Sequence, residues 1–103
     1  MGSEREPRYV ISIAARMVGV GTHTLRYYER MGLVEPERSP GGLRLYSERE
    51  VERLRHVKTL MDDLGINLAG VEVVLRLMER LASLQREMEE IRKQMGGNEE
   101  MTP

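Results

Sequence analysis

The clearest hydrophobic pattern in this sequence lies in its second half, where apolar residues recur at alternating spacings of three and four. These residues are Val74, Leu77, Leu81, Leu84, Met88, Ile91 and Met95. Glu, Arg, Lys and Gln fill most of the positions between them. This is the heptad seam of a coiled coil, and it predicts a dimerisation helix. The alternative is that the seam packs against the first half of the same chain.

The first half of the chain predicts two short helices joined by a glycine-containing turn. Ser12 can cap a helix over residues 13–18, and the glycines at 19 and 21 end it. Thr22 can cap a second helix, which Gly32 closes in the left-handed conformation. Two short helices in this order are the helix-turn-helix pattern.

A small β-hairpin, or wing, is expected next. Two short apolar segments flank residues 37–42, whose Pro-Gly-Gly sequence can supply a positive φ for a turn. Side chains alternate between the two faces of a strand. Arg44 and Tyr46 therefore share one face, which we expect to point outward, while Leu43 and Leu45 share the face that packs.

Helical spacing then returns. Ser47 and Glu50 form a capping box that begins a third helix, and Gly65 ends this helix. Asn67 can cap the segment that carries the seam. Residues 68–95 contain no obvious helix breaker, so one helix and two consecutive helices both remain open. The predicted fold class is mainly α with a small β-hairpin, a winged helix-turn-helix followed by a dimerisation helix.

The composition excludes several kinds of site. The chain has 103 residues, which is enough for one domain with a modest core. It contains no cysteine, so neither a disulfide nor a thiolate metal site is possible. The sequence shows no nucleophile-and-base pair and no phosphate-binding glycine loop. We therefore expect no catalytic residue, metal or cofactor, and we expect self-association to supply additional stability.

Charge and aromatic residues divide the chain near its middle. Residues 1–60 hold 11 Lys and Arg against 8 Asp and Glu, a balance of +3, whereas residues 61–103 hold 5 against 9, a balance of −4. All four tyrosines lie in the basic half, which is the half expected to meet nucleic acid. No apolar run approaches the ~18 residues of a membrane span and no signal peptide is visible, so we expect a soluble, cytoplasmic protein.

Several segments of the first half resemble one family of bacterial regulators. They are Ile13-Ala14-Ala15 with Gly19-Val20, Thr24-Leu25-Arg26-Tyr27-Tyr28-Glu29, Gly32-Leu33-Val34 and Gly42-Leu43-Arg44-Leu45-Tyr46-Ser47. In order and spacing they are similar to the DNA-binding domain of MerR-type transcription regulators over residues 9–78. The resemblance implies a winged helix-turn-helix that binds double-stranded DNA, followed by a helix that dimerises as an antiparallel coiled coil.

Within this family, three segments are similar to heat-shock repressors. They are Tyr9-Val10-Ile11-Ser12 with Ala14-Ala15, Ser39-Pro40-Gly41-Gly42, and Gly65-Ile66-Asn67-Leu68-Ala69-Gly70-Val71. The resemblance implies a homodimeric repressor of heat-shock and chaperone genes that binds an inverted-repeat operator on the bacterial nucleoid. The alternative is a regulator of another stress or metabolic operon that activates or represses by DNA distortion.

The resemblance also bears on the signal. Metal-sensing members carry cysteines beside the dimer helix and drug-sensing members attach a ligand-binding domain, and this sequence shows neither. We therefore expect no small-molecule effector. Similarity to the heat-shock repressors implies a DnaK-type chaperone as co-repressor, and a purely thermal switch is the rival.

The candidate DNA-binding residues lie mostly on the second helix and the wing. Side chains near the start of a recognition helix approach base edges, while later ones and the wing reach phosphates. Tyr28 shares a side with Leu25 and is expected in the core instead. The candidates are Arg16, Thr22, His23, Thr24, Arg26, Tyr27, Arg38, Arg44, Tyr46 and Asn67.

For some candidates a plainer role is open. Arg16 can form a salt bridge, His23 can be a partly exposed helix-start residue, and Asn67 can serve chiefly as a helix cap. The predicted organisation is a disordered arm over residues 1–8 and a DNA-binding domain over residues 9–78. A dimerisation helix over residues 79–96 and a disordered tail over residues 97–103 follow.

Overall fold

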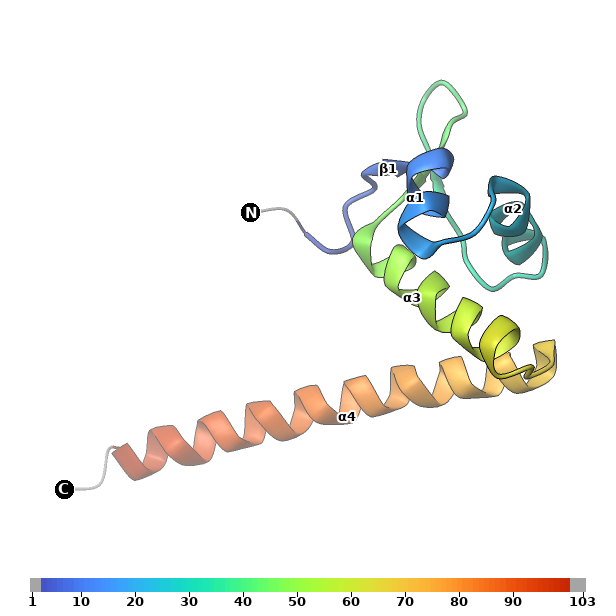
Figure 1. The fold of residues 1–103 in the computed structure, drawn as a ribbon. Helices are drawn as coiled ribbons and strands as arrows, with labels where there is room; N and C mark the ends of the chain where they lie inside the picture. The colour runs from blue at the N-terminus through green and yellow to red at the C-terminus, as the bar shows by residue number, and fades with distance from the viewer. Residues whose placement is uncertain (1–2, 101–103) are drawn as a thin grey trace. The chain divides into compact units, whose positions relative to one another are not determined.

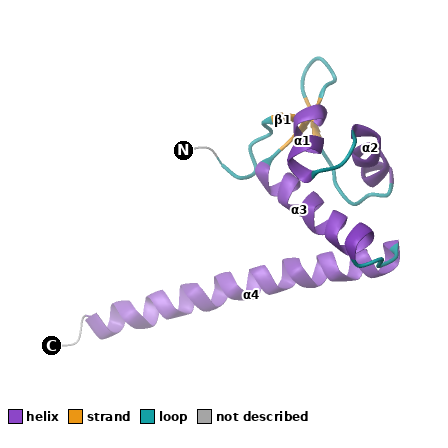
Figure 2. Ribbon diagram, viewed as in Figure 1, coloured by secondary structure: helices purple, strands orange, loops and turns teal. Residues whose placement is uncertain are grey.

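The computed structural model describes the backbone of residues 3–100 and the side chains of residues 3–96. The chain forms two compact units, of which the first ends at Val71 and the second begins at Glu72. Helices predominate, and one small sheet lies in the first unit (Figures 1 and 2). This agrees with the predicted fold class.

The first unit begins its helical part with α1 (Ile11–Val18) and α2 (Thr22–Arg30). Both helices form as predicted, but neither expected cap is used. Extended backbone at Val10 comes directly from a strand, so Val10 takes the cap position of α1 and Ser12 is already inside the helix. Gly21 likewise takes the cap position of α2, which makes Thr22 its first helical residue.

The C-terminus of α2 is closed by a left-handed glycine, as predicted. Gly32 has a φ of 77°, a conformation that costs a residue with a Cβ atom about 1–2 kcal/mol. The Leu33 N–H then donates to the Tyr28 carbonyl oxygen at 3.0 Å. This bond turns the chain back beneath the helix, and it leaves Leu33 buried.

The sheet contains the predicted wing and one strand more. It consists of β1 (Tyr9–Val10), β2 (Glu37–Arg38) and β3 (Arg44–Tyr46), all antiparallel, in the order β1-β3-β2. Leu45 lies opposite Val10 on one side and Glu37 on the other. The predicted first strand is misplaced, because β2 lies at Glu37–Arg38, within the segment expected to form the turn. The turn is therefore shorter than predicted, and a hydrogen bond of 2.9 Å joins the Gly42 N–H to the Ser39 carbonyl oxygen.

α3 (Glu48–Lys58) begins at the capping box that the sequence predicts. The Glu50 N–H donates to Ser47 Oγ at 3.1 Å, and the Ser47 N–H donates to Glu50 Oε1 at 2.9 Å. The helix continues into a π-helical turn, η1 (Thr59–Asp63), before Gly65 turns the chain with a φ of 67°.

The seam lies on a single helix, α4 (Leu68–Glu100), which settles the open alternative in favour of one helix. The Gly70 N–H donates to Asn67 Oδ1 at 2.9 Å, so Asn67 caps this helix as predicted. The second unit, as far as the structure describes it, consists of α4 from Glu72 onward. No helix within the described residues is both long and apolar enough to cross a membrane.

The core of the first unit draws on every one of its α-helices. Its buried apolar side chains are Ala14, Ala15, Val18, Leu25, Tyr28, Leu33, Val34, Tyr46, Val51, Leu54, Val57 and Val71. α1 contacts both α2 and α3, and the tip of the hairpin projects away from these helices (Figure 1). Tyr28 is 2% exposed, which confirms its predicted place in the core.

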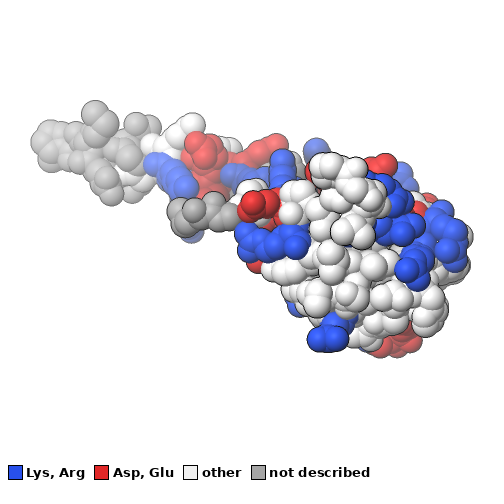
Figure 3. Space-filling view, turned by 90° about the horizontal axis from the view of Figure 1, so that it is seen from above, with Lys and Arg blue, Asp and Glu red and all other residues white. Residues whose placement is uncertain are grey.

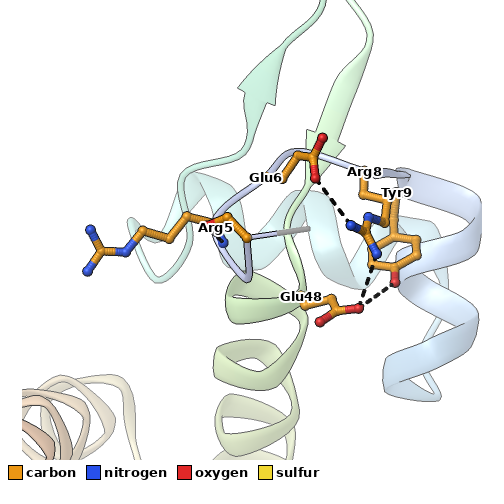
Figure 4. A network of polar contacts seen from close by, with 6 residues as sticks. Arg5, Glu6, Arg8, Tyr9 and Glu48 are labelled. Atoms are coloured by element: carbon orange, nitrogen blue, oxygen red, sulfur yellow. Dashed lines mark hydrogen bonds and ion pairs between the residues drawn. The ribbon is translucent and has the colours of Figure 1, made fainter. Parts of the chain in front are cut away.

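Residues 3–8 are joined to the wing and to α3, although the sequence predicts a disordered arm there. The Arg49 N–H donates to the Glu4 carbonyl oxygen, and the Arg8 N–H donates to the Tyr46 carbonyl oxygen. Glu48 Oε1 accepts from Arg8 at 3.5 Å and from the Tyr9 hydroxyl at 3.2 Å (Figure 4). These hydrogen bonds place the N-terminal segment alongside β3.

Two serines, one that caps a helix and one that does not, form a matched pair for mutation. Ser47→Ala removes half of the capping box and is expected to lower the free energy of unfolding by about 1 kcal/mol. Ser12 is exposed and caps nothing, so Ser12→Ala is expected to change it by less than about 0.5 kcal/mol. Urea unfolding of both variants checks this, and equal losses would contradict the assignment of the caps.

Candidate nucleic-acid interface

The exposed face of α2 brings together three of the predicted DNA-binding side chains and one further cation. Leu25 and Tyr28 point into the core, and each helical residue is rotated by about 100° from the last. The opposite face therefore carries His23, Arg26, Tyr27 and Arg30, all of them exposed. Among the described residues neither Arg26 nor Arg30 has an ion-pair partner, so both cations are available to an anion.

The start of α2 is shaped by the close approach of an imidazole to a glycine. A Cβ atom added at Gly21 would lie 2.6 Å from His23 Cε1, so the ring lies over the backbone at the start of the helix. Thr22 and Thr24 are half-buried beside it. The predicted contacts to base edges therefore depend on the exposed His23 more than on the two threonines.

Both predicted arginines of the wing are held by one carboxylate of α2. Arg44 Nε donates to Glu29 Oε2 at 2.5 Å, and Arg38 Nη2 donates to Glu29 Oε1 at 3.3 Å. Arg38 Nη1 also donates to the Gly42 carbonyl oxygen at 3.4 Å, within the turn of the hairpin. Each guanidinium has five N–H donors, so these bonds leave further donors for phosphate oxygens.

The prediction that Tyr46 points outward is wrong. Its side chain is fully buried, while Leu43, on the face expected to pack, is 61% exposed. The face of β3 that packs is thus the reverse of the predicted one, because the helices lie on the Tyr46 side of the sheet. Burial raises the pKa of the Tyr46 hydroxyl, and no described group forms a hydrogen bond with it.

The two remaining candidates lie apart from the face of α2. Arg16 is exposed in the last turn of α1 and has no ion-pair partner among residues 3–96, so the salt-bridge alternative finds no support. Asn67 uses its Oδ1 to cap α4. Its contact with the DNA backbone stays a prediction.

Sequence reasoning missed two residues of this site. Arg30 follows Arg26 by one turn and lies on the same exposed face, which its spacing of four could have indicated. Glu29 is noted only as one residue of the family-like segment 24–29, since no local pattern reveals that its carboxylate will contact two arginines of the hairpin.

Figure 3 shows Lys and Arg side chains gathered along one edge of the first unit, with fewer Asp and Glu among them.

The predicted seam forms an apolar stripe along α4. Six of its seven residues are exposed, namely Leu77, Leu81, Leu84, Met88, Ile91 and Met95, and Val74 is half-buried. Their exposed fractions run from 40% at Leu84 to 69% at Met88. A stripe of this kind on one helix is typical of an interface that another helix covers.

Residues 9–78 match the family of MerR HTH regulatory proteins, and this match covers more than half of the chain. The chain belongs to the MerR family. Members of this family are DNA-binding transcription regulators and not enzymes, in agreement with the predicted lack of a catalytic site.

Several curated MerR-family proteins are similar to the chain. It is 44% identical over 95 residues to the putative heat shock protein HspR of Streptomyces coelicolor, across 92% of this chain and 63% of that protein. It is 39% identical over 82 residues to the mercuric resistance operon regulatory protein of Bacillus cereus, across 79% and 61%. The chain therefore spans less than two thirds of the length of these relatives.

Two solved MerR-family structures share this fold. One is a transcriptional regulator from Bacillus cereus, 30% identical with a TM-score of 0.57 over 91% of this chain and 79% of that one. The other is HiNmlR, described as lacking the sensor domain and bound to promoter DNA, 20% identical with a TM-score of 0.60 over 89% and 76%. At this lower identity the second likeness concerns the fold alone.

The opposite placements of two tyrosines lead to a prediction about their hydroxyl groups. Tyr27→Phe removes an exposed donor from the face of α2 and is expected to weaken binding to promoter DNA by about 0.5–1.5 kcal/mol. Tyr46→Phe removes a buried hydroxyl that has no partner among the described residues, so DNA affinity should stay within about 0.5 kcal/mol of wild type and stability should not fall.

Titration of labelled duplex DNA and thermal unfolding of both variants check this pair. A loss of DNA binding by a stable Tyr46→Phe protein would restore Tyr46 to the interface.

Proposed function

We propose that this protein is a transcription repressor of heat-shock and chaperone genes that binds an inverted-repeat operator as a homodimer. The observation that carries the proposal is the exposed cationic face of α2 beside a wing with two arginines, in a MerR-family chain 44% identical to HspR of Streptomyces coelicolor. The heat-shock assignment rests on that similarity together with the three segments noted in the sequence.

The exposed face of α2 suits the major groove of duplex DNA. In a helix-turn-helix the second helix enters this groove with its first residues nearest the bases. His23 then lies where an imidazole can donate to or accept from a purine edge. Arg26, Tyr27 and Arg30 follow on the same face and can donate to phosphate oxygens, which adds affinity and fixes the register of the helix.

The wing can add further contacts to the DNA backbone beside α2. The Arg38 and Arg44 guanidinium groups lie next to the C-terminal end of α2 through Glu29, and both carry donors beyond those that Glu29 accepts. Phosphates that flank the bound groove are the natural acceptors for such groups. Binding through these cations is expected to weaken as salt concentration rises.

Dimerisation through the seam explains why the operator should be an inverted repeat. An apolar stripe on α4 can be covered by the same stripe of a second copy, and two-fold symmetry then presents two identical α2 faces. Each face reads one half-site, and linking them raises the overall affinity well above that of one module. We propose an antiparallel coiled coil for this contact.

Membership of the MerR family leaves one alternative function open. The second candidate is a regulator of another stress or metabolic operon, which activates or represses transcription by DNA distortion. Mercury sensing is disfavoured because this sequence has no cysteine, and thiolates are the ligands that soft metal ions prefer.

For the signal, we propose a DnaK-type chaperone as co-repressor in the bacterial cytoplasm, without a small-molecule effector. Such chaperones bind extended apolar segments, and the end of the seam around Met88 to Met95 is the candidate on this chain. When unfolded proteins bind the chaperone instead, the repressor would lose its co-repressor and dissociate from the operator. Thermal melting of a small dimer is the rival mechanism, since warming reduces both folding and association.

One binding experiment tests target and signal together. The protein is titrated onto DNA from upstream of the chaperone genes of its own genome, and onto promoter DNA of equal length from a metabolic operon. We expect about 10³-fold or greater preference for the chaperone promoter. At constant temperature, added DnaK-type chaperone should raise occupancy of that promoter.

Equal binding to both promoters would contradict the heat-shock assignment. Occupancy that ignores the chaperone but falls steeply on mild heating would replace the co-repressor by thermal melting.

A charged residue in the seam tests the dimer. Leu84→Glu places a carboxylate in the apolar stripe and is expected to give monomers that have lost about 10²-fold or more in promoter affinity. Gln85→Glu adds the same charge at an exposed position beside the stripe and should leave the dimer intact. Analytical ultracentrifugation measures the state of association, and a dimeric Leu84→Glu protein would exclude the seam as the interface.

A further inference from the structure

Glu29 is the point where the recognition helix and the wing meet. It is the residue before the last of α2, and its two carboxylate oxygens accept separately from the two arginines of the hairpin. Oε2 accepts from Arg44 Nε on β3, and Oε1 accepts from Arg38 Nη2 on β2. One side chain thus joins α2 to both strands of the wing.

The Arg44–Glu29 pair is better shielded than the Arg55–Glu52 pair on the surface of α3, whereas the Arg38 side chain of the second Glu29 pair is 51% exposed. The side chain of Glu29 is 21% exposed and that of Arg44 is 29% exposed, whereas both partners of the Arg55–Glu52 pair exceed 45%. Reduced exposure strengthens an ion pair, because solvent screens it less. The Arg44–Glu29 contact is therefore suited to hold a defined geometry.

The wing has few other attachments to α2. Its strands β2 and β3 span two and three residues, and β3 is joined on its other side to β1 and not to a helix. Arg38 also donates to the Gly42 carbonyl oxygen, so the arginine that meets Glu29 holds the turn as well. Release of Glu29 would remove this link between α2 and the outer part of the hairpin, while burial of Tyr46 still holds the end of β3 in the core.

The same carboxylate also lowers the charge that the wing presents. Two guanidinium groups and one carboxylate sum to +1, so one of the two wing cations is compensated in the free protein. Phosphate binding by a cation depends on charge and carries no sequence information. A compensated wing therefore adds less to binding of arbitrary DNA than two free arginines would add.

The geometry points to Glu29 as a positioning residue that sets how well the protein distinguishes its operator from other DNA. It holds Arg38 and Arg44 at a fixed place relative to α2, and it withholds part of their charge from non-specific phosphate contacts. This inference rests on the proposed DNA-binding function and deepens it. Glu29 itself is not expected to touch DNA, because a carboxylate is repelled by phosphate.

The test compares Glu29→Gln with Glu37→Gln, a matched control on β2. Glu37 is exposed and has no ion pair among the described residues, so its variant changes the net charge equally without freeing the wing. Each protein is titrated over a salt series onto the chaperone-promoter duplex and onto a scrambled duplex of equal length.

For Glu29→Gln we expect the salt dependence on scrambled DNA to steepen by about one unit. The ratio of promoter affinity to scrambled affinity should fall about three- to tenfold. Glu37→Gln should leave this ratio unchanged. A Glu29→Gln ratio equal to that of Glu37→Gln would overturn the inference.

A measurement without DNA separates this inference from the proposed function. NMR relaxation of the amides of residues 37–44 should show faster and larger motion in Glu29→Gln than in wild type. Glu29→Asp keeps the charge but shortens the reach, so it should loosen the wing while leaving the salt dependence near that of wild type.

A wing as ordered in Glu29→Gln as in wild type would overturn the inference even in a protein that binds DNA. A wild-type protein that binds neither duplex would instead contradict the proposed function.

Discussion

Burial of Tyr46 is the constraint on which the N-terminal unit depends. Its side chain is fully buried at the end of β3, so the strand cannot shift without exposing it. With β3 held there, Leu45 pairs with β1 and β2, Arg44 reaches Glu29 of α2, and Ser47 begins α3. Four consecutive residues thus connect the N-terminal segment, the wing, the recognition helix and the third helix.

This arrangement explains how a small domain holds α2 and the wing, the two elements proposed to bind DNA, in a fixed relation. Leu25 and Tyr28 anchor α2 in the core, which turns His23, Arg26 and Arg30 outward on the opposite face. Burial of Tyr46 fixes the end of the wing nearest α3, and the ion pairs of Glu29 join its outer part to α2. The proposed DNA-binding geometry therefore depends on both the apolar core and these charged groups.

Much of this fold could be predicted from local patterns, although they misplaced the caps of α1 and α2 by one or two residues, and the larger errors arise from tertiary packing. Helical periodicity, left-handed glycines and the capping box of Ser47 depend on neighbouring residues and were predicted correctly. The face of β3, by contrast, depends on which side the helices cover, and alternation alone cannot supply that. Strand β1 is too short to show alternation, so only its pairing with β3 reveals it. The ion pairs of Glu29 with two arginines distant in the sequence likewise arise only from tertiary packing.

Selection of bound duplexes from a random DNA pool tests the central claim most directly, because it requires no prior operator. If two α2 faces and two wings act together in a symmetric dimer, the recovered sequences should contain two inverted half-sites at one constant spacing. Enrichment should also weaken as the salt concentration of the selection rises. Recovery of single half-sites, or of no common sequence at any salt concentration, would contradict a dimeric winged helix-turn-helix that reads an operator.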